Sequence, residues 1–352
     1  EVDMSGFIVK PGEVIKEYLD DRNITQKEVA QRIGISEKHL SNLLNGKTRL
    51  TEDMALKLEK IMPDVQASFW LHYEVKYQEY MAREKEKYNL KEADLEAIAE
   101  RFHFNEVFKR SNKPLVEQAI DMLKLLGVTD FDRFKSALPL GMEFMQDGGE
   151  EEAAVVWIKQ CEQAAEEQNK PLDGVMFNPK TLEDALPRIK NIALNPDVDD
   201  SINSCRKCLN RCGIYLVVMP AIVNSKIRGA LTTYKNHPAV FLSKRYKTHD
   251  HVWFTIVHEL AHLLLHYDTS NILISEEDLS SEDHKDKEAN KFARDFLVNP
   301  DDYAALGNHE QFTEQVITKF ARKQNVHPGM IVGFLQHDGL IPFEQMNGLK
   351  SK

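Results

Sequence analysis

The stretch VWFTIVHELAHLLL, residues 252–265, carries the pattern H-E-x-x-H at His258, Glu259 and His262 inside an apolar run. On a helix, residues four apart lie on one face about one turn from each other, so both imidazoles can bind one cation. Glu259 then lies beside a water that the cation activates. The stretch therefore predicts a buried helix and a hydrolytic metal centre, with zinc as the first metal to test and manganese as the second.

The third ligand of this centre is expected from another segment. A zinc ion that acts as a Lewis acid takes three protein ligands and keeps one position for water. His266 lies two turns beyond His258, a rise of about 12 Å at 1.5 Å per residue, which is too far for three imidazoles to share one ion. The longer signature that adds a distant histidine also fails, because Asp268 stands at that position.

The acidic segment DKEANKFARDFL, residues 286–297, offers two carboxylates, Asp286 and Glu288. At about 100° per residue its apolar residues share one stripe, with Asp286 at the edge of the stripe and Glu288 pointing away from it. We predict Asp286 as the third ligand and keep Glu288 as the alternative. Asn290 is expected to hydrogen-bond behind the ligands.

The sequence HELAHLLLH followed by DKEANKFARDFLVNP resembles the ImmA/IrrE family of metallo-endopeptidases, whose pattern is HExxH followed by ExxAN-x-FA-x-x-LL-x-P. The likeness covers roughly the last half of the chain and includes GA at 229–230, FLS at 241–243, RY at 245–246, Asp250, WFT at 253–255, PGMIVG at 328–333 and LQ at 335–336. The resemblance implies a zincin-like peptidase. The family's metal-binding glutamate aligns with Asp286, whose side chain is one methylene shorter. Three arrangements would accommodate this difference: the helix lies closer to the metal, a water bridges Asp286 and the metal, or Glu288 is the ligand instead.

Peptide hydrolysis is the reaction that these parts predict. Glu259 takes the proton of the attacking water and passes it to the leaving amine. A donor for the tetrahedral oxyanion is also needed. Several nearby side chains can supply it, and the sequence leaves the choice open among His237, Tyr246, His251 and Tyr267. The alternative is a metal site that serves structure alone.

Four short helical segments near the amino-terminal end, 11–21, 25–34, 36–45 and 51–62, predict a helix-turn-helix. Thr25, Ser36 and Thr51 are typical N-cap residues, and Gly34 and Gly46 are typical of helix ends. The apolar residues expected in the core are Val14, Ile15, Leu19, Val29, Ala30, Ile33, Ile35, Leu40, Leu43, Leu44, Met54, Leu56, Leu58 and Ile61.

In such a unit the segment after the Gly34 turn enters the major groove of DNA. The residues expected at base edges are Ser36, Glu37, Lys38, His39, Ser41 and Asn42, and those expected at phosphates are Gln26, Lys27, Lys47 and Arg49. We predict operator DNA as a partner, and a homodimer, because one small module buries too little surface for tight specificity. The alternative is a helix-turn-helix used only for dimerisation or for holding a partner protein.

The segment from Lys10 to Ile61 resembles the HigA antitoxin branch of the Cro/C1-type regulators, including the PGE opening at 11–13 and the later FWL at 69–71. The resemblance implies an autorepressor that also binds a toxin. From Glu1 to Asp64 acids slightly outnumber bases, and the whole chain has a formal net charge of -11. DNA binding is therefore expected to depend on a local patch rather than on general attraction to phosphates.

The composition, with 42% hydrophobic and 29% charged residues among 352, is that of a globular protein of two or three domains. We predict an α+β, mostly helical fold with a helix-turn-helix domain at 1–75, a helical middle at 76–192, a metallopeptidase domain with a small β-sheet at 193–305, and a helical extension at 306–352. No run reaches the length of a membrane span and the start EVDMSGF lacks a signal-peptide pattern, so we expect a cytoplasmic protein with no membrane partner.

Periodicity predicts further elements between and after these motifs. The expected helices are 70–88, 91–102, 115–126, 131–138, 150–167, 181–192 with a kink or break at Pro187, and two within 312–336; the expected strands are 213–220 and 239–243. Residues 276–283 are expected to form a solvated loop beside the site, or alternatively a lid.

Three of the four cysteines, Cys205, Cys208 and Cys212, recur at helical spacing on the apolar face of a helix that ends at Gly213. A thiol metal site or redox switch is one interpretation. Core packing of small apolar thiols is the favoured one, and Cys161 is expected to do the same.

The leading hypothesis is a DNA-binding transcriptional regulator with zinc-dependent endopeptidase activity that cleaves a partner repressor or a toxin-related protein. The alternative is a HigA-type antitoxin that represses its own operon and neutralises a toxin, with the metal domain structural rather than catalytic.

Overall fold

The computed structural model describes residues 8–91, 93–138, 150–244, 248–269, 272–276, 284–308 and 311–350. The chain divides into two compact units, Glu1–Leu95 and Glu96–Lys352. The domain boundaries expected at residues 75, 192 and 305 stay predictions. Among the helices of the described residues, none combines the length and the apolar character that crossing a bilayer requires.

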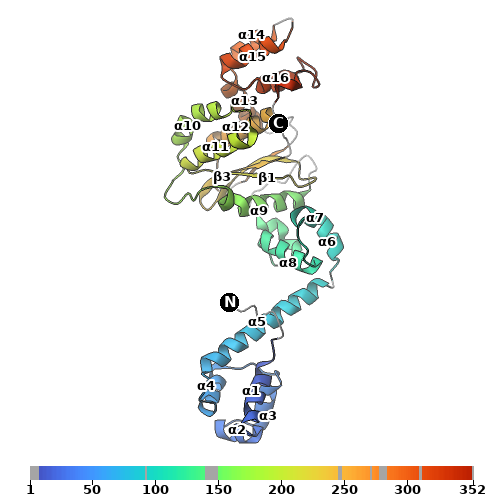
Figure 1. Cartoon of the computed structure of the whole chain (residues 1–352), viewed down its shortest axis with the longest axis vertical. Coiled ribbons are helices and arrows are strands. Elements are labelled where there is room, and N and C mark those ends of the chain that lie inside the picture. The colour runs from blue at the N-terminus through green and yellow to red at the C-terminus, as the bar shows by residue number, and fades with distance from the viewer. Residues whose placement is uncertain are drawn as a thin grey trace. The chain divides into compact units, whose positions relative to one another are not determined.

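The first unit is all-helical. Its helices are α1 (Pro11–Asp21), α2 (Gln26–Ile33), α3 (Glu37–Leu44), α4 (Glu52–Ile61) and α5 (Ala67–Lys91), and Figure 1 shows α1 to α4 gathered beside one end of α5. The first four confirm the predicted helix-turn-helix segments.

The ends of these helices follow from local hydrogen bonds. The side chains of Thr25, Ser36 and Thr51 each accept a hydrogen bond from the backbone N–H three residues later, as predicted for N-caps. Gly34 ends α2 with φ of 70°, a left-handed conformation in which a Cβ is disfavoured. The tight turn from Gly34 to Ser36 therefore separates α2 from α3.

A single apolar cluster holds the first unit together, and Trp70 from α5 joins it with 1% of its surface exposed. The predicted core residues are buried or partly buried in this cluster, with one exception. Leu56 is 55% exposed, so its prediction was wrong. Met54, Ala55 and Leu58 share the inner face of α4. Leu56 follows Ala55 directly and is rotated about 100° from it around the helix axis, so its side chain points away from the core.

The next helices along the chain are α6 (Leu95–Arg101), α7 (Phe104–Val107), α8 (Leu115–Leu126), the 3-10 helix η1 (Phe131–Ala137) and α9 (Glu151–Gln168). The middle of the chain is therefore helical, as expected. The helix predicted at 91–102 differs, because α5 runs on to Lys91 and a new helix begins only at Leu95, while residue 92 lies outside the described residues.

The second unit contains a four-stranded sheet of β1 (Tyr215–Met219), β2 (Ile227–Tyr234), β3 (His237–Ser243) and β4 (Leu273–Glu276), in the order β1-β3-β2-β4. β1 is parallel to β3, and β2 is antiparallel to both β3 and β4. The strands predicted at 213–220 and 239–243 are confirmed as β1 and β3. β2 and β4 were not predicted, and the hairpin from β2 to β3 turns at Lys235 and Asn236, both with positive φ, without the usual Asn-Gly signal.

Helices cover both faces of the sheet. Figure 1 shows α9 on one face, and α10 (Pro179–Ile192), α11 (Val198–Arg211) and α12 (His249–Leu265) on the other. Trp157 of α9 packs edge-on against Phe241 of β3 with ring centroids 6.4 Å apart. On the other face, the indole N–H of Trp253 donates to Ser201 at 3.1 Å, which joins α12 to α11.

Pro187 lies inside α10 without dividing it, so the predicted break is absent, while the predicted kink stays a prediction. A proline in a helix leaves the carbonyl four residues earlier without its backbone donor. Both Pro187 and Glu183, which carries that carbonyl, lie on the exposed side of α10. Water can therefore take over the missing hydrogen bond, and the helix continues to Ile192.

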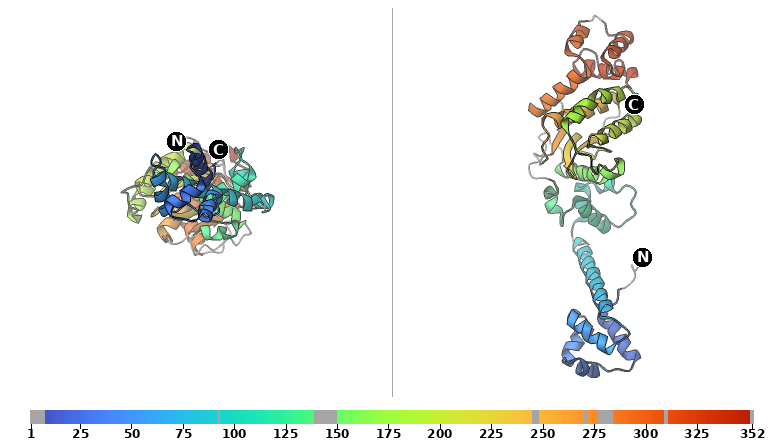
Figure 2. Two further views of the ribbon diagram at one scale, coloured as in Figure 1. Left: turned by 90° about the horizontal axis from the view of Figure 1, so that it is seen from below. Right: turned by 90° about the vertical axis from the view of Figure 1, so that its left-hand side faces the viewer.

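The carboxyl-terminal helices are α13 (His284–Leu297), α14 (Pro300–Gly307), α15 (Glu314–Gln324), α16 (Pro328–His337) and the 3-10 helix η2 (Asn347–Leu349). Figure 2 shows α14 to α16, in orange to red, grouped at one end of the second unit. α14 was not predicted. Pro300 ends the preceding pattern and also begins the new helix, with Asn299 as its N-cap.

The four cysteines are free thiols buried in the protein interior. Cys205, Cys208 and Cys212 belong to the large core cluster of the second unit, on or just after α11. This confirms the prediction that they pack as small apolar side chains.

His249, at the start of α12, makes the stability of the second unit sensitive to acid. Its side chain is fully buried against the ring of His327, with centroids 4.5 Å apart. Burial, with the neighbouring His327, lowers the pKa of His249 to about 4, although hydrogen bonds with the backbone of Ala193 and Asn195 and the charge of Asp250 act in the opposite direction. When folding lowers a histidine pKa, the stability that the neutral ring contributes is fully present at pH values above the unfolded-state pKa of about 6.5. This contribution is lost as pH falls towards 4, because the unfolded chain then binds a proton that the folded chain does not.

Between pH 7 and pH 5 we expect the free energy of unfolding of the native chain to fall by about 1–2 kcal/mol more than that of H249F. The variant lacks the imidazole that binds the proton. Urea unfolding at several pH values measures this difference. The exposed His72 provides the control H72F, which should keep the native slope. Equal slopes for the native chain and H249F would contradict the assignment.

Candidate functional site

The apolar run around His258 folds into α12, a largely buried helix of the second unit. From Thr255 to Leu263 every side chain of α12 is buried, because the helix packs against the sheet on one side and other helices around it. His258, Glu259 and His262 are 1%, 0% and 2% exposed. Buried polar groups of this kind destabilise a fold unless they find partners, so three of them on adjoining turns indicate a site.

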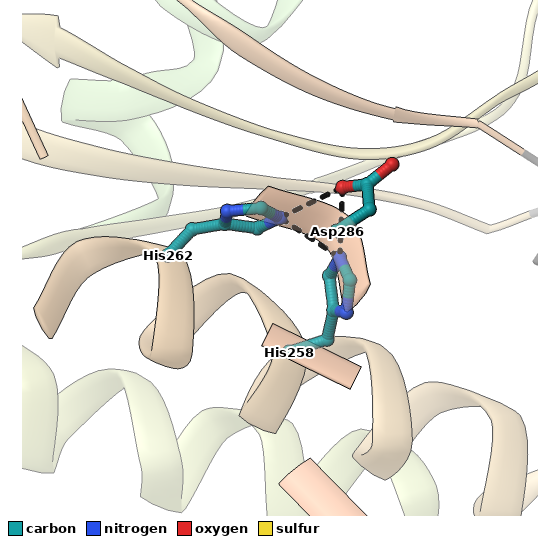
Figure 3. A group of neighbouring side chains, drawn as sticks. All are labelled: His258, His262 and Asp286. Atoms are coloured by element: carbon teal, nitrogen blue, oxygen red, sulfur yellow. Dashed lines mark hydrogen bonds and ion pairs between the residues drawn. The ribbon is translucent and has the colours of Figure 1, made fainter. Parts of the chain in front are cut away.

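Three side chains converge on one point between α12 and α13. The Nε2 atoms of His258 and His262 lie 3.0 Å apart, and Oδ1 of Asp286 lies 3.1 Å from His262 Nε2 and 3.7 Å from His258 Nε2. Figure 3 shows both rings and the carboxylate turned towards the same small space. These side chains can together hold one metal ion.

The distances fit a single small cation. A point equidistant from the three ligand atoms lies about 1.9 Å from each, close to the 2.0–2.2 Å that zinc requires from nitrogen and oxygen. Burial lowers the pKa of His258 to about 3, so its imidazole is neutral, which is the form that binds metals. The residues therefore fit a divalent cation with two nitrogen ligands and one oxygen ligand.

Asp286, rather than Glu288, joins the two imidazoles. Oε2 of Glu288 instead lies 2.9 Å from Nε2 of His266, on the outer side of the site. The shorter aspartate reaches because α13 packs closely along α12. Its side chain is 19% exposed, which leaves one side of the group open.

His266 has a contact that its distance from His258 did not suggest. Its Nδ1 lies 3.1 Å from Nδ1 of His262, while its Nε2 faces Glu288. If Nε2 of His262 binds the cation, Nδ1 of His262 carries the proton and donates to His266, and His266 in turn donates to Glu288. Such a chain holds the ligand ring in one tautomer and one orientation.

Glu259 lies on the sheet side of the group. A Cβ at Gly229 of β2 would lie 2.3 Å from Oε1 of Glu259, so only glycine leaves room for this carboxylate. The hydroxyl of Ser275 on β4 lies close enough to act on the carboxylate, although neither carboxylate oxygen meets the strict geometry of a hydrogen bond. Burial raises the pKa of Glu259 to about 6, in the range that suits a group that both takes and returns a proton near neutral pH.

The predicted supporting residues take different places. Asn290 lines a cavity beside the site, and its side chain lies in hydrogen-bonding position next to His258, in line with the role predicted for it. Among the oxyanion candidates, the His237 ring bonds to the carbonyl of Gly213 at 3.2 Å and the Tyr267 hydroxyl bonds to Thr233 at 2.8 Å. His251 lines the same cavity as Asn290. Tyr246 lies outside the described residues, and so do residues 277–283 of the loop predicted at 276–283.

Arg228 is a residue of this region that the sequence did not indicate. It precedes Gly229 on β2, is 7% exposed, and lines two cavities next to α12. Its positive charge lowers the pKa values of both His258 and Glu259, so the guanidinium lies close to the group. No spacing pattern could have found it, because strand pairing decides where it points.

The residues predicted to contact DNA lie outside the core of the first unit. Gln26 and Lys27 begin α2; Ser36, Lys38 and His39 begin α3; Lys47 and Arg49 follow it; and all seven are exposed, while Ser41 and Asn42 are half-buried. Ser36, His39 and Arg49 line one hollow together with Thr48 and Lys57, two residues that the prediction omitted. The exposed start of α3 thus offers donors and acceptors of the kind that read base edges.

Comparison with known proteins places two families on the chain. Residues 15–69 match the helix-turn-helix family and residues 210–333 match the family of the IrrE N-terminal-like domain. The first match begins within α1 and runs through α4 to the start of α5, and the second covers the sheet, α12, α13 and the group formed by His258, His262 and Asp286. The HigA branch suggested by the sequence stays a prediction.

Three relatives match short stretches. The "Uncharacterized HTH-type transcriptional regulator YddM" of Escherichia coli (strain K12) is 40% identical over 53 residues, 15% of this chain and 56% of that protein. "Virulence-associated protein A'" and "Virulence-associated protein A" of Dichelobacter nodosus are 36% and 34% identical over 67 and 68 residues, each 19% of this chain and 58% and 67% of those proteins. The match thus spans little more than half of the first two relatives.

The chain from His262 through His266 to Glu288 predicts an effect on metal affinity. We expect H266A to weaken the binding of zinc by about 10- to 100-fold, because His262 loses the acceptor that orients it. Competition with a zinc-binding dye measures the dissociation constant. The matched control is H284A, since His284 also lies near Glu288, at 3.4 Å, but contacts no ligand and is mostly exposed. Equal zinc affinity in H266A and H284A would contradict this role.

Proposed function

Because the chain combines a Cro/C1-type helix-turn-helix with an IrrE/ImmA-like domain, we propose that it is a DNA-binding transcriptional regulator with zinc-dependent endopeptidase activity. The observation that carries the peptidase proposal is the convergence of His258, His262 and Asp286 on one point beside the buried carboxylate of Glu259. The exposed α3 after the Gly34 turn supports the DNA-binding part.

His258, His262 and Asp286 would hold the zinc ion, and Glu259 would serve as the general base. When bound, the cation supplies a Lewis acid that polarises the scissile carbonyl and makes a water acidic. Glu259 would take a proton from the attacking water and return it to the nitrogen of the leaving amine.

The substrate is proposed to bind as an extended peptide beside the sheet. β4 is the outer strand next to β2, and within the described residues its other edge pairs with no strand. An added peptide strand would satisfy this edge with main-chain hydrogen bonds. Ser275 of β4 pairs with Gly229 of β2, and Gly229 lies against Glu259. A peptide added to β4 would therefore lie one strand away from the strand that contacts Glu259.

A repressor or a toxin-related protein is the proposed substrate, and operator DNA the proposed meeting place in the cytoplasm. A peptidase held at an operator as a homodimer would meet a repressor on the same DNA at high effective concentration, without any further contact between the two proteins.

The likeness of residues 10–61 to the HigA branch favours a second candidate. In it the chain is an antitoxin that represses its own operon and binds a toxin, while the metal domain serves only to fold or dock. The two candidates differ in whether Glu259 is needed.

Replacement of Glu259 tests the peptidase. We expect E259Q to keep zinc at the native stoichiometry and to lower the cleavage rate by about 100- to 10,000-fold, because the proton acceptor is lost and the ligands stay. Elemental analysis and cleavage of a quenched fluorescent peptide library measure the two effects. H258A and D286A should lose the metal, whereas E288Q should retain it. A native chain that cleaves nothing while E259Q still neutralises a toxin would support the antitoxin instead.

Replacements in the first unit test the DNA interface. We expect N42A to weaken binding to a selected operator more than to random DNA, by about 1–3 kcal/mol, because it removes a contact to a base edge. K47A and R49A should each weaken both DNAs and lower the salt dependence of binding by about one ion. Fluorescence anisotropy across a range of salt concentrations measures both. If N42A affects both DNAs equally, α3 does not read the bases.

A further inference from the structure

A cavity of about 350 Å³ lies beside the metal centre. Its walls come from four elements: Phe254 and Thr255 of α12, Asn290 of α13, Phe334 of α16 and Arg228 of β2. Its size falls in the range of pockets that receive a small ligand or a large side chain.

The cavity adjoins the ligands on both helices. Phe254 stands one turn before His258 on α12, and their rings lie 6.4 Å apart. On α13, Asn290 stands one turn after Asp286. A peptide held at the metal centre would therefore bring the side chain next to its scissile bond to this cavity.

The lining favours an apolar occupant. Phe254, Met330 and Phe334 contribute apolar surface, and charged or polar side chains, among them Lys287 and His337, complete the lining. Two carboxylates of the region are already neutralised: Asp250 by Lys350 at 2.7 Å, and Asp338 by Arg294 at 2.6 Å. Because these charges are satisfied within the protein, a large apolar side chain can bury its surface here without separating a charge from its partner.

Arg228 reaches this region through an irregularity in strand pairing. The register between β2 and β4 shifts between Ile227 and Gly229, which leaves Arg228 as the extra residue of a β-bulge. A bulge changes the direction in which a side chain points. Arg228 consequently lines both this cavity and a second one of about 430 Å³, so its side chain lies between the two.

We propose that this cavity receives a large apolar side chain next to the scissile bond of the substrate, and that Arg228 holds the substrate beside it by donating to a backbone carbonyl oxygen. The guanidinium has five N–H donors in a planar fork, so it can bind a carbonyl in addition to other contacts. This inference rests on the proposed peptidase function and names the class of peptide that the site accepts.

Succinyl hydroxamates with a methyl, an isobutyl or a benzyl side chain test the cavity. Their hydroxamate binds zinc and their side chain occupies the position next to the scissile bond. We expect the benzyl compound to bind the zinc-loaded chain about 10- to 100-fold more tightly than the methyl compound, in proportion to the apolar surface buried. Isothermal titration calorimetry measures binding without requiring turnover.

The variant F254A tests whether this cavity is responsible. We expect the ratio between benzyl and methyl affinities to fall below about three, because the apolar wall is lost. The ratio cancels any change in zinc affinity, since both compounds share the hydroxamate. The matched control is F292A, which removes a partly buried phenylalanine that packs against the same core but does not line the cavity. F292A should keep the native ratio.

Arg228 is tested with the same compounds, which carry an amide carbonyl. We expect R228M to weaken all of them by about 10- to 100-fold, because a charge-assisted hydrogen bond is lost, and R228K to restore part of the affinity. The control K287M removes an exposed cation from the same cavity lining and should change affinity less than about threefold.

The outcomes separate this inference from the peptidase proposal. A preference for benzyl that F254A abolishes, in a chain that cleaves no peptide, would support the cavity and reject the peptidase. Cleavage of peptides with equal affinity for methyl and benzyl compounds would reject the cavity and leave the peptidase. Failure of every hydroxamate to bind zinc-loaded protein would also overturn the inference, as would equal losses in R228M and K287M.

Discussion

The meeting of two imidazoles from the buried helix α12 with one carboxylate from the amphipathic helix α13 is the constraint on which the second unit depends. Polar groups of this kind lower stability in an apolar interior unless each has a partner. The structure supplies partners around α12: Asp250 pairs with Lys350, and His262 contacts His266, which in turn faces Glu288. The remaining polar atoms of His258, His262 and Asp286 face one another, where a cation would satisfy all three.

Close packing at two glycines sets the position of α12. Gly229 brings β2 against Glu259, and a Cβ at Gly333 of α16 would lie 2.6 Å from Oδ2 of Asp250. A side chain at either position would push the helix from the sheet or from α16. These contacts place the carboxylate of Glu259 at the sheet edge that β4 completes, so the packing of the fold and the geometry of the site have the same origin.

The two units have separate apolar cores, one around Leu40, Leu58 and Trp70 and the other around α12 and the sheet. Each unit therefore has its own packing: the first core supports α3, and the second core supports the group formed by His258, His262 and Asp286. In the proposed function, the benefit of joining them lies in local concentration, since a shared chain keeps a peptidase near the DNA that its first unit binds.

Features that depend on local geometry could be predicted from the sequence by itself. The caps at Thr25, Ser36 and Thr51, the pairing of His258 with His262 and the choice of Asp286 all follow from helical spacing, which relates residues a few positions apart. β2, β4, the bulge at Arg228, the room at Gly229 and the contact of His266 with Glu288 could not be predicted in this way. They join segments far apart in the chain, and only the packing of the sheet against α12 and α13 decides which of those segments touch.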